Sequence, residues 1–284
     1  MRLFCFGFGY CAEALAERLA GRSGVSVAGT RTRARNDGGS AVEIAAFAGD
    51  ARSADVARLL EGATHVLVSI PPDLEGDPAL RHHGADLAAL SSLGWVGYLS
   101  TIGVYGDCGG AWIDETAPVR PQSERALRRV RAEEQWRQFG AQTGKRVQIF
   151  RLPGIYGPGR SVIDSLRRGE ARRIVKPGQV FNRIHVADIA ATLDLAMAGA
   201  SEHDVFNVVD DEPAPPQDVI AFGAELLGLP VPPDTPFERA SLSPMGRSFY
   251  DEVKRVRNER IKTALGVRLA FPTYREGLAA IVRG

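Results

Sequence analysis

The chain has few of the features that would place it in a specialised class of protein. It contains three cysteines among 284 residues, and they form no C-x-x-C pair and no histidine spacing that suits zinc. Its formal net charge is +1, which gives no reason to expect nucleic acid or an anionic membrane as a partner. No apolar run approaches the roughly 18 residues that span a bilayer, and the N-terminal apolar stretch is too short for a secretory signal. We therefore expect a cytoplasmic protein without a structural metal.

The composition that remains is ordinary for a globular protein, with 44% hydrophobic and 24% charged residues. Strand and helix patterns alternate through the first half of the sequence. This alternation predicts βαβ units and a Rossmann-type, doubly wound parallel sheet covered on both faces. The expected strands are 3–6, 24–29, 41–47, 64–70, 97–101 and 147–152, and the expected helices are 10–20, 54–60, 79–93 and 123–138.

The second half is less regular and rich in proline between residues 212 and 236. It predicts one late strand at 205–209 and helices at 162–168, 186–197, 218–227, 258–265 and 273–282. We expect a dinucleotide-binding core over residues 1–157, completed by about 179–210. A smaller substrate-binding lobe would comprise residues 158–178 and 211–284.

The N-terminus carries the first functional signal, because an apolar strand runs directly into a glycine turn and a helix. Gly7, Gly9 and Ala12 form G-x-G-x-x-A, in which the first glycine allows a tight turn and the second lets the backbone approach a pyrophosphate. The alternative is an ordinary strand-to-helix turn that contains glycines. The residues expected to contact a dinucleotide here are Gly7, Gly9, Tyr10 and Cys11.

The end of the second strand indicates which dinucleotide binds. A carboxylate that would hold the ribose of NAD is absent there, whereas Arg31 and Arg33 suit the 2′-phosphate of NADP. NADP is therefore the expected cofactor, with NAD as the alternative cofactor and a solvated basic loop as the structural alternative. Ser69 and Pro71, after the fourth strand, are expected to pass beside the cofactor, although strand-end packing explains Ser69 equally well.

Four motifs occur in a fixed order over most of the chain. Residues 98–118 read YLSTIGVYGDCGGAWIDETAP, 151–159 read RLPGIYGPG, 182–189 read NRIHVADI and 206–208 read FNV. Together they resemble the extended short-chain dehydrogenase/reductases, the NAD-dependent epimerase/dehydratase family. The opening G-x-G-x-x-A departs from that family's usual G-x-x-G-x-x-G, so the chain resembles the atypical members of the group.

The resemblance implies a catalytic Ser/Thr together with a Tyr-x-x-x-Lys pair on one helix. Thr101 stands at the Ser/Thr position and would orient a substrate oxygen, the alternative being an ordinary strand-end threonine; Ser100 is expected beside the cofactor. The pair itself is missing. The register set by Glu133 places Arg125 at the tyrosine position and Arg129 at the lysine position, and arginine does not release a proton near neutral pH.

Further residues are expected at the substrate, each with a structural alternative. Arg125 belongs either to an anion clamp or to a solvated helix face, and Tyr105 is either a substrate contact or family scaffold. His185 is a substrate residue or a satisfied structural histidine, and Arg183 forms a binding pair or a structural ion pair with Asp188.

These observations favour an NAD(P)-dependent oxidoreductase or epimerase acting on a small polar or nucleotide-sugar-like substrate. The alternative is a non-catalytic NAD(P)-binding protein, such as a redox sensor or regulatory subunit, because the glycine turn is present and the acid/base pair is not. The resemblance also implies a homodimer, paired through the helix expected at 123–138.

Overall fold

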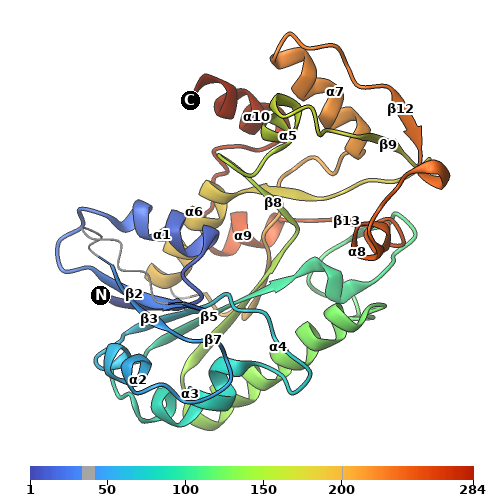
Figure 1. Cartoon of the computed structure of the whole chain (residues 1–284). Coiled ribbons are helices and arrows are strands. Elements are labelled where there is room, and N and C mark those ends of the chain that lie inside the picture. The colour runs from blue at the N-terminus through green and yellow to red at the C-terminus, as the bar shows by residue number, and fades with distance from the viewer. Residues whose placement is uncertain (34–41, 200) are drawn as a thin grey trace.

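Seven parallel strands form the central sheet of the computed structural model, in the order β11-β7-β5-β4-β1-β2-β3 (Figure 1). The structure describes residues 1–33, 42–199 and 201–284; residue 41, the predicted start of the third strand, lies outside them. The strand order reverses between β1 and β4, which is the topological switch point of a doubly wound sheet. The strands are β1 (Arg2–Phe6), β2 (Ser26–Arg31), β3 (Glu43–Ala46), β4 (His65–Val68), β5 (Trp95–Thr101), β7 (Arg146–Leu152) and β11 (Val205–Asn207).

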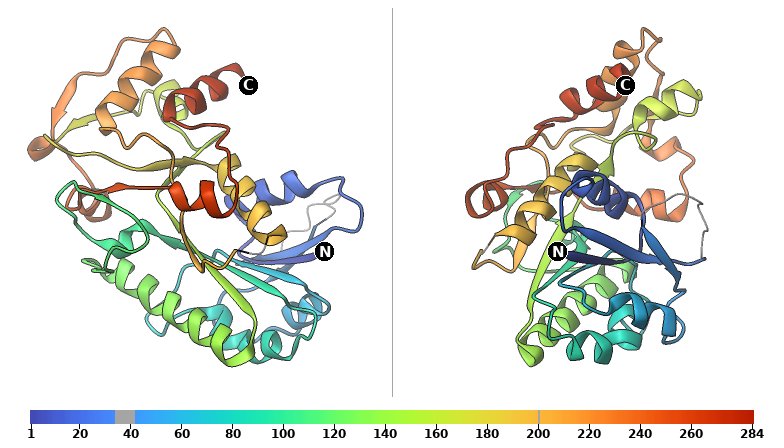
Figure 2. Two further views of the ribbon diagram at one scale, coloured as in Figure 1. Left: turned by 180° about the vertical axis from the view of Figure 1, so that it is seen from behind. Right: turned by 90° about the vertical axis from the view of Figure 1, so that its left-hand side faces the viewer.

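Helices cover both faces of this sheet (Figures 1 and 2), which confirms the predicted fold class. Side chains alternate along β1, so that Leu3 and Cys5 pack into one buried cluster while Phe4 and Phe6 pack into the other. The first cluster is covered by α1 (Tyr10–Leu19), α6 (Val186–Ala198) and α9 (Glu259–Ala264), and the second by α2 (Ala54–Leu60), α3 (Pro78–Ala89) and α4 (Glu124–Thr143).

Local sequence explains where the helices begin and end. The Ser123 hydroxyl caps the start of α4 by accepting from the Ala126 N–H, and the helix continues past the predicted end until Gly144, which adopts a left-handed φ of 69°. The Asp77 carboxylate caps α3, and Pro78 occupies its first turn. That helix ends at Ala89, before the predicted end at residue 93.

A smaller lobe stands beyond one edge of the sheet (Figures 1 and 2). Its helices are α5 (Val162–Arg167), α7 (Pro216–Leu226), α8 (Pro244–Ser248) and α10 (Tyr274–Arg283). Short parallel pairs, which the sequence did not predict, join distant segments: β8 (Gly154–Tyr156) with β10 (Arg183–His185), β9 (Arg173–Val175) with β12 (Asp234–Pro236), and β6 (Trp112–Ile113) with β13 (Arg255–Val256). The two single-turn helices are η1 (Ile102–Tyr105) and η2 (Phe237–Arg239).

The C-terminal stretch contributes to both parts of the molecule. Ile261 and Val267 are buried in the cluster beneath α1 and α6, whereas Tyr274 and Leu278 pack in the lobe with Val219. The predicted division assigned all of residues 211–284 to the lobe, whereas α9 packs on the sheet. Which of the two parts holds a cofactor and which holds a substrate stays a prediction.

Two further properties bear on function. Within the described ranges, none of the helices combines the length and apolar character needed to cross a bilayer. The same ranges contain no group of three or more His, Cys, Asp or Glu residues that could hold a metal ion.

Candidate cofactor and substrate site

The glycine turn is built for close approach of a ligand. Gly7 has a φ of +90°, and a Cβ at this position would lie 2.7 Å from the Ser69 hydroxyl oxygen. The Gly7 N–H donates to the Thr30 hydroxyl at 2.9 Å, and the Ser69 hydroxyl donates to the Gly7 carbonyl at 2.7 Å. Gly9 is exposed, and a Cβ built there meets no protein atom within 4 Å. The turn is therefore held rigidly at Gly7 and left open at Gly9.

The first turn of α1 faces this open space. Gly9 is the N-cap residue, and no side chain of the described residues caps the helix, so backbone N–H groups and the positive end of the helix dipole remain for an anion. The Cys11 side chain is 8% exposed and packs in the core, where burial raises the pKa of its thiol to about 11. Cys11 can therefore serve a cofactor only through its backbone. These features fit a dinucleotide pyrophosphate.

The two arginines after the glycine turn differ in their surroundings. Arg31, the last residue of β2, donates from Nε to the Phe8 carbonyl at 3.0 Å and from Nη2 to the Glu13 carboxylate at 2.6 Å. Arg33 is exposed two residues further on. Because Glu13 neutralises part of the Arg31 charge, Arg33 is the stronger source of positive charge at this edge.

Ser69 and Pro71 follow β4 at the same edge of the sheet. The Ser69 hydroxyl supports the glycine turn through Gly7, which is a structural role that the sequence did not reveal. Pro71 is exposed. A cofactor contact by either residue remains a prediction.

Two neighbouring hydroxyl groups at the end of β5, those of Ser100 and Thr101, have different surroundings. Ser100 is 5% exposed and donates to the Glu133 carboxylate at 2.6 Å, so its side chain points into the protein interior rather than toward a cofactor. Thr101 is partly exposed, and its hydroxyl oxygen accepts from the Gly103 N–H at 3.1 Å. Thr101 keeps its hydroxyl proton for donation to a ligand.

Ser100 belongs to a buried polar network that the sequence did not predict. Arg151 donates to both oxygens of Glu133, at 3.0 and 2.7 Å, and to the Tyr105 hydroxyl at 2.8 Å. That hydroxyl donates in turn to the Asn207 side chain at 2.8 Å. Tyr105 is 1% exposed. The substrate contact expected of Tyr105 is therefore corrected: this tyrosine ties β5, β7 and β11 together.

The positions of the missing acid/base pair lie on α4. Arg125 is exposed in the first turn of the helix, as the solvated-face alternative expected. Arg129 folds back onto β5, where it donates to the Leu99 carbonyl at 2.8 Å and to the Tyr98 hydroxyl at 3.0 Å. Neither guanidinium can exchange protons with a substrate near neutral pH.

His185 and Arg183 lie on β10 with different environments. His185 is 5% exposed, accepts from the Ala187 N–H at 3.2 Å and packs against Tyr156 and Phe271. Burial lowers the pKa of its imidazole to about 4. The substrate contact expected of His185 is corrected to a structural role as the N-cap of α6. Arg183 lines a cavity instead, and the expected pair with Asp188 does not form, because that carboxylate accepts from the Ala270 and Phe271 N–H groups.

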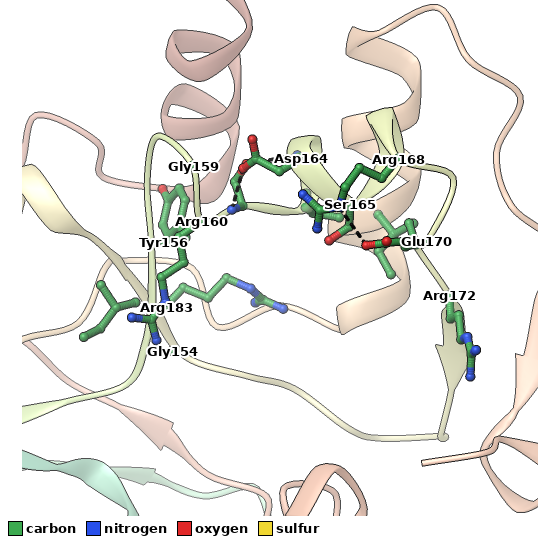
Figure 3. Close-up of a pocket in the computed structure, with 15 residues that line it drawn as sticks. Gly154, Tyr156, Gly159, Arg160, Asp164, Ser165, Arg168, Glu170, Arg172 and Arg183 are labelled. Carbon is green, nitrogen blue, oxygen red and sulfur yellow. Dashed lines mark hydrogen bonds and ion pairs between the residues drawn. The ribbon is translucent and has the colours of Figure 1, made fainter. Parts of the chain in front are cut away.

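The cavity has a volume of about 630 Å³ and lies within the lobe (Figure 3). Its walls come from β8, α5, the segment that follows α5, β10 and α7. The charged lining residues are Arg160, Arg168, Arg172, Arg183, Asp164 and Glu170.

The charge of this lining is predominantly positive. Arg168 is paired with Glu170 at 2.7 Å, and Asp164 is engaged by Ser161 in a capping box. Among the described residues, none of the other cavity arginines forms an ion pair with a carboxylate. Three of the four cavity arginines, Arg160, Arg168 and Arg172, were not predicted as site residues from the sequence. All three lie in the arginine-rich segment 160–173, which directly follows the Y-G-P-G motif and could have indicated them.

One contact joins the cavity to the glycine turn. The Tyr10 hydroxyl, at the start of α1, donates to the Pro158 carbonyl at 3.1 Å. The Arg160 guanidinium lies over the Tyr10 ring, 5.6 Å from its centroid. Arg160 also lines the cavity. A ligand in the cavity and a dinucleotide on the glycine turn would therefore be neighbours.

Fold and site together define a Rossmann-type protein with an open glycine turn and an adjoining cationic cavity. The family model described as the NAD dependent epimerase/dehydratase family matches residues 86–208. A functionally unknown conserved protein from Silicibacter pomeroyi DSS is 48% identical, with a TM-score of 0.87 over 99% of this chain and 98% of that chain. Residues 86–208 therefore belong to the NAD-dependent epimerase/dehydratase family, and the whole chain shares its fold with the 48% identical relative.

More distant solved structures share the fold. UDP-glucuronic acid 4-epimerase from Bacillus cereus, in complex with UDP-glucuronic acid and NAD, is 16% identical, with a TM-score of 0.77 over 100% of this chain and 99% of that chain. DesIV, a dTDP-glucose 4,6-dehydratase from Streptomyces venezuelae with NAD and TYD bound, is 19% identical, with a TM-score of 0.76 over 100% and 96%. No curated protein matches the sequence.

Proposed function

We propose that this chain is an NAD(P)-dependent oxidoreductase or epimerase that acts on a small, anionic, nucleotide-sugar-like substrate. The observation that carries the proposal is the adjacency of two sites: a glycine turn left open at Gly9, and a cationic cavity joined to it through Tyr10 and Arg160. Relatives of the same fold were solved with NAD and a sugar nucleotide together. In this proposal residues 1–157, completed by about 179–210, hold the cofactor, and 158–178 with 211–284 hold the substrate.

The residues at the carboxyl edge of the sheet have defined tasks in this proposal. When bound, the nicotinamide accepts or donates hydride. Backbone N–H groups in the first turn of α1 hold the pyrophosphate, which approaches through the open space at Gly9, while Gly7 shapes the turn. Thr101 donates a hydrogen bond from its hydroxyl group to a substrate oxygen, while the hydroxyl oxygen accepts from the Gly103 N–H. Arg183 binds an anionic part of the substrate within the cavity.

The proposed cofactor is NADP, with NAD as the alternative. Arg33 is exposed at the end of β2, where a 2′-phosphate would lie, and Arg31 is anchored beside it by Phe8 and Glu13. Titration of the purified protein with NADPH and NADH, followed by nicotinamide fluorescence, tests this choice. Tighter binding of NADH would reverse it.

Turnover is tested on the protein loaded with each cofactor and offered UDP-glucose, UDP-glucuronic acid, dTDP-glucose and simple carbonyl compounds. Absorbance at the nicotinamide band reports net redox change. Chromatography of the sugar nucleotides reports epimerisation, which leaves that absorbance unchanged. Conversion of an anionic sugar nucleotide supports the proposal. Binding of cofactor with no binding of any sugar nucleotide contradicts the substrate half of it.

A second candidate is a non-catalytic NAD(P)-binding sensor or regulatory protein. It is favoured by one specific observation: Arg125 is exposed, and Arg129 is committed to Leu99 and Tyr98, so neither position of the expected acid/base pair on α4 supplies a group that exchanges protons near neutral pH. Turnover of any substrate in the assay above would refute this candidate. Tight cofactor binding with sugar nucleotides bound but unchanged would favour it.

A further inference from the structure

Two side chains of opposite charge, the half-buried Arg183 and the buried Asp210, lie near each other without forming an ion pair. The Arg183 guanidinium donates through Nη1 to the Phe181 and Ala214 carbonyls, at 2.8 and 3.0 Å, and its pKa is lowered by burial. Asp210 is 2% exposed, and its backbone N–H donates to the Arg183 carbonyl at 2.7 Å. No ion pair joins the two side chains, both of which lie in the described part of the chain.

The Asp210 carboxyl forms few hydrogen bonds for a buried group. One oxygen accepts from the Glu212 N–H at 3.3 Å, while Oδ2 is buried and has no hydrogen-bond partner among residues 1–33, 42–199 and 201–284. An ionised carboxylate in this state is unfavourable, whereas a protonated carboxyl is tolerated. Burial raises the pKa of Asp210 to about 8, although Arg183 opposes that rise.

The other charged groups nearby are already committed. Asp211, on the same turn, is paired with Lys262 at 2.6 Å, and Glu212 is paired with Arg275 at 3.1 Å. Both carboxylates raise the pKa of Asp210 by their negative charge. Tyr156 of β8 and Tyr274 of α10 also face this cluster. Among the residues that the structure describes, Arg183 thus has no carboxylate within ion-pair distance, and it lines a cavity from which an anion can come.

We propose that Asp210 is a proton-controlled counter-ion of Arg183 and thereby sets the affinity of the cavity for anions. Protonated Asp210 leaves the Arg183 charge available to a phosphate or carboxylate of the ligand. Ionised Asp210 competes for that charge and repels the ligand. Anion binding and proton uptake at Asp210 are therefore coupled, and each favours the other. This inference rests on the proposed function, since it assumes an anionic ligand in the cavity.

The affinity for UDP-glucose between about pH 7 and about pH 9 tests the coupling, because the diphosphate of this probe keeps a constant charge over that range. If ligand binding raises the pKa of Asp210 from about 8 by one unit, binding weakens about fivefold between pH 7 and pH 9 and about tenfold in the limit of higher pH. The Asp210→Asn variant should bind with little pH dependence. Its matched control, Asp211→Asn, changes the neighbouring exposed carboxylate and should keep the pH dependence with a shifted midpoint.

A second measurement needs no variant. Titration calorimetry of the wild type in buffers of different ionisation enthalpy gives the number of protons exchanged on binding, and the proposal expects net uptake near pH 8. Binding that is independent of pH, or that releases protons, would overturn the proposal, as would an Asp210→Asn variant with the wild-type pH dependence. Absence of UDP-glucose binding at every pH would instead count against the proposed substrate class, so the two failures are distinguishable.

Discussion

The glycine turn allows a substitution that separates cofactor binding from folding. A Cβ at Gly9 meets no protein atom within 4 Å, and the residue has a φ of −120°, which alanine adopts freely. Gly9→Ala should therefore cost at most about 1 kcal/mol of folding free energy, the difference between glycine and alanine as N-cap residues. The added methyl group occupies the space through which a pyrophosphate reaches the backbone. We expect cofactor binding to be lost while the fold is kept.

The magnitude follows from ligand linkage. At a concentration of 100 times its dissociation constant, a cofactor stabilises the wild type by about 2.7 kcal/mol. A chain of this size gains roughly 2 °C in Tm for each kcal/mol, so the wild-type shift should be about 5 °C. Gly9→Ala should show a shift near zero at the same concentration. Differential scanning fluorimetry with NADPH and NADH measures both.

Two comparison variants sharpen this test. Gly94→Ala makes the same change at another glycine without close neighbours, away from the turn, and should retain the full cofactor shift. Gly7→Ala should instead destabilise the fold by about 1–3 kcal/mol, because it forces a side chain into a positive φ and against Ser69. A Gly9→Ala protein with a wild-type cofactor shift would refute the assignment of the turn. A Gly9→Ala protein that loses several kcal/mol of stability would refute the inference of open space.

Three further predictions concern the interior and α4. Glu133→Gln should cost about 3–5 kcal/mol in urea unfolding, since it leaves a buried guanidinium uncompensated; a loss below 1 kcal/mol would contradict that network. The His185 ring should titrate near pH 4 by NMR. Because the unfolded chain binds this proton more tightly, its titration should lower the free energy of unfolding by about 3 kcal/mol as pH falls from about 6.5 to about 4. Titration of Asp210 changes the free energy of unfolding in the opposite direction over this pH range. The effect of His185 is therefore measured as the difference in free energy of unfolding between the wild type and His185→Gln, and a difference that does not change with pH would refute it. The double variant Arg125→Tyr with Arg129→Lys restores the Tyr-x-x-x-Lys pair of the family. If this variant turns over a sugar nucleotide that the wild type leaves unchanged, the acid/base pair is the one catalytic element that the wild type lacks.

Much of the fold could be predicted because its elements are long enough to show a period. Residues 3–6 form an apolar run typical of a buried strand, and 54–60 matches α2 residue for residue. The two- and three-residue strands of the lobe could not be predicted, since a pattern with a period of two needs more residues to be visible. The partners of β8 and β10 are also nearly thirty residues apart in the chain, as Gly154 pairs with Arg183.

The residues of the candidate site, like the elements of the fold, could be predicted from the sequence only in part. The sequence by itself determined the glycine turn at Gly7 and Gly9, the hydroxyl at Thr101 and the loss of the Tyr-x-x-x-Lys pair, because each depends on residue type at a fixed spacing. The tertiary structure decided what the remaining polar residues do. Tyr105 and His185 proved to be buried scaffold, and Arg183 proved to line a cavity beside an unpaired Asp210. Burial and charge pairing depend on which distant segments meet, and local patterns do not record that.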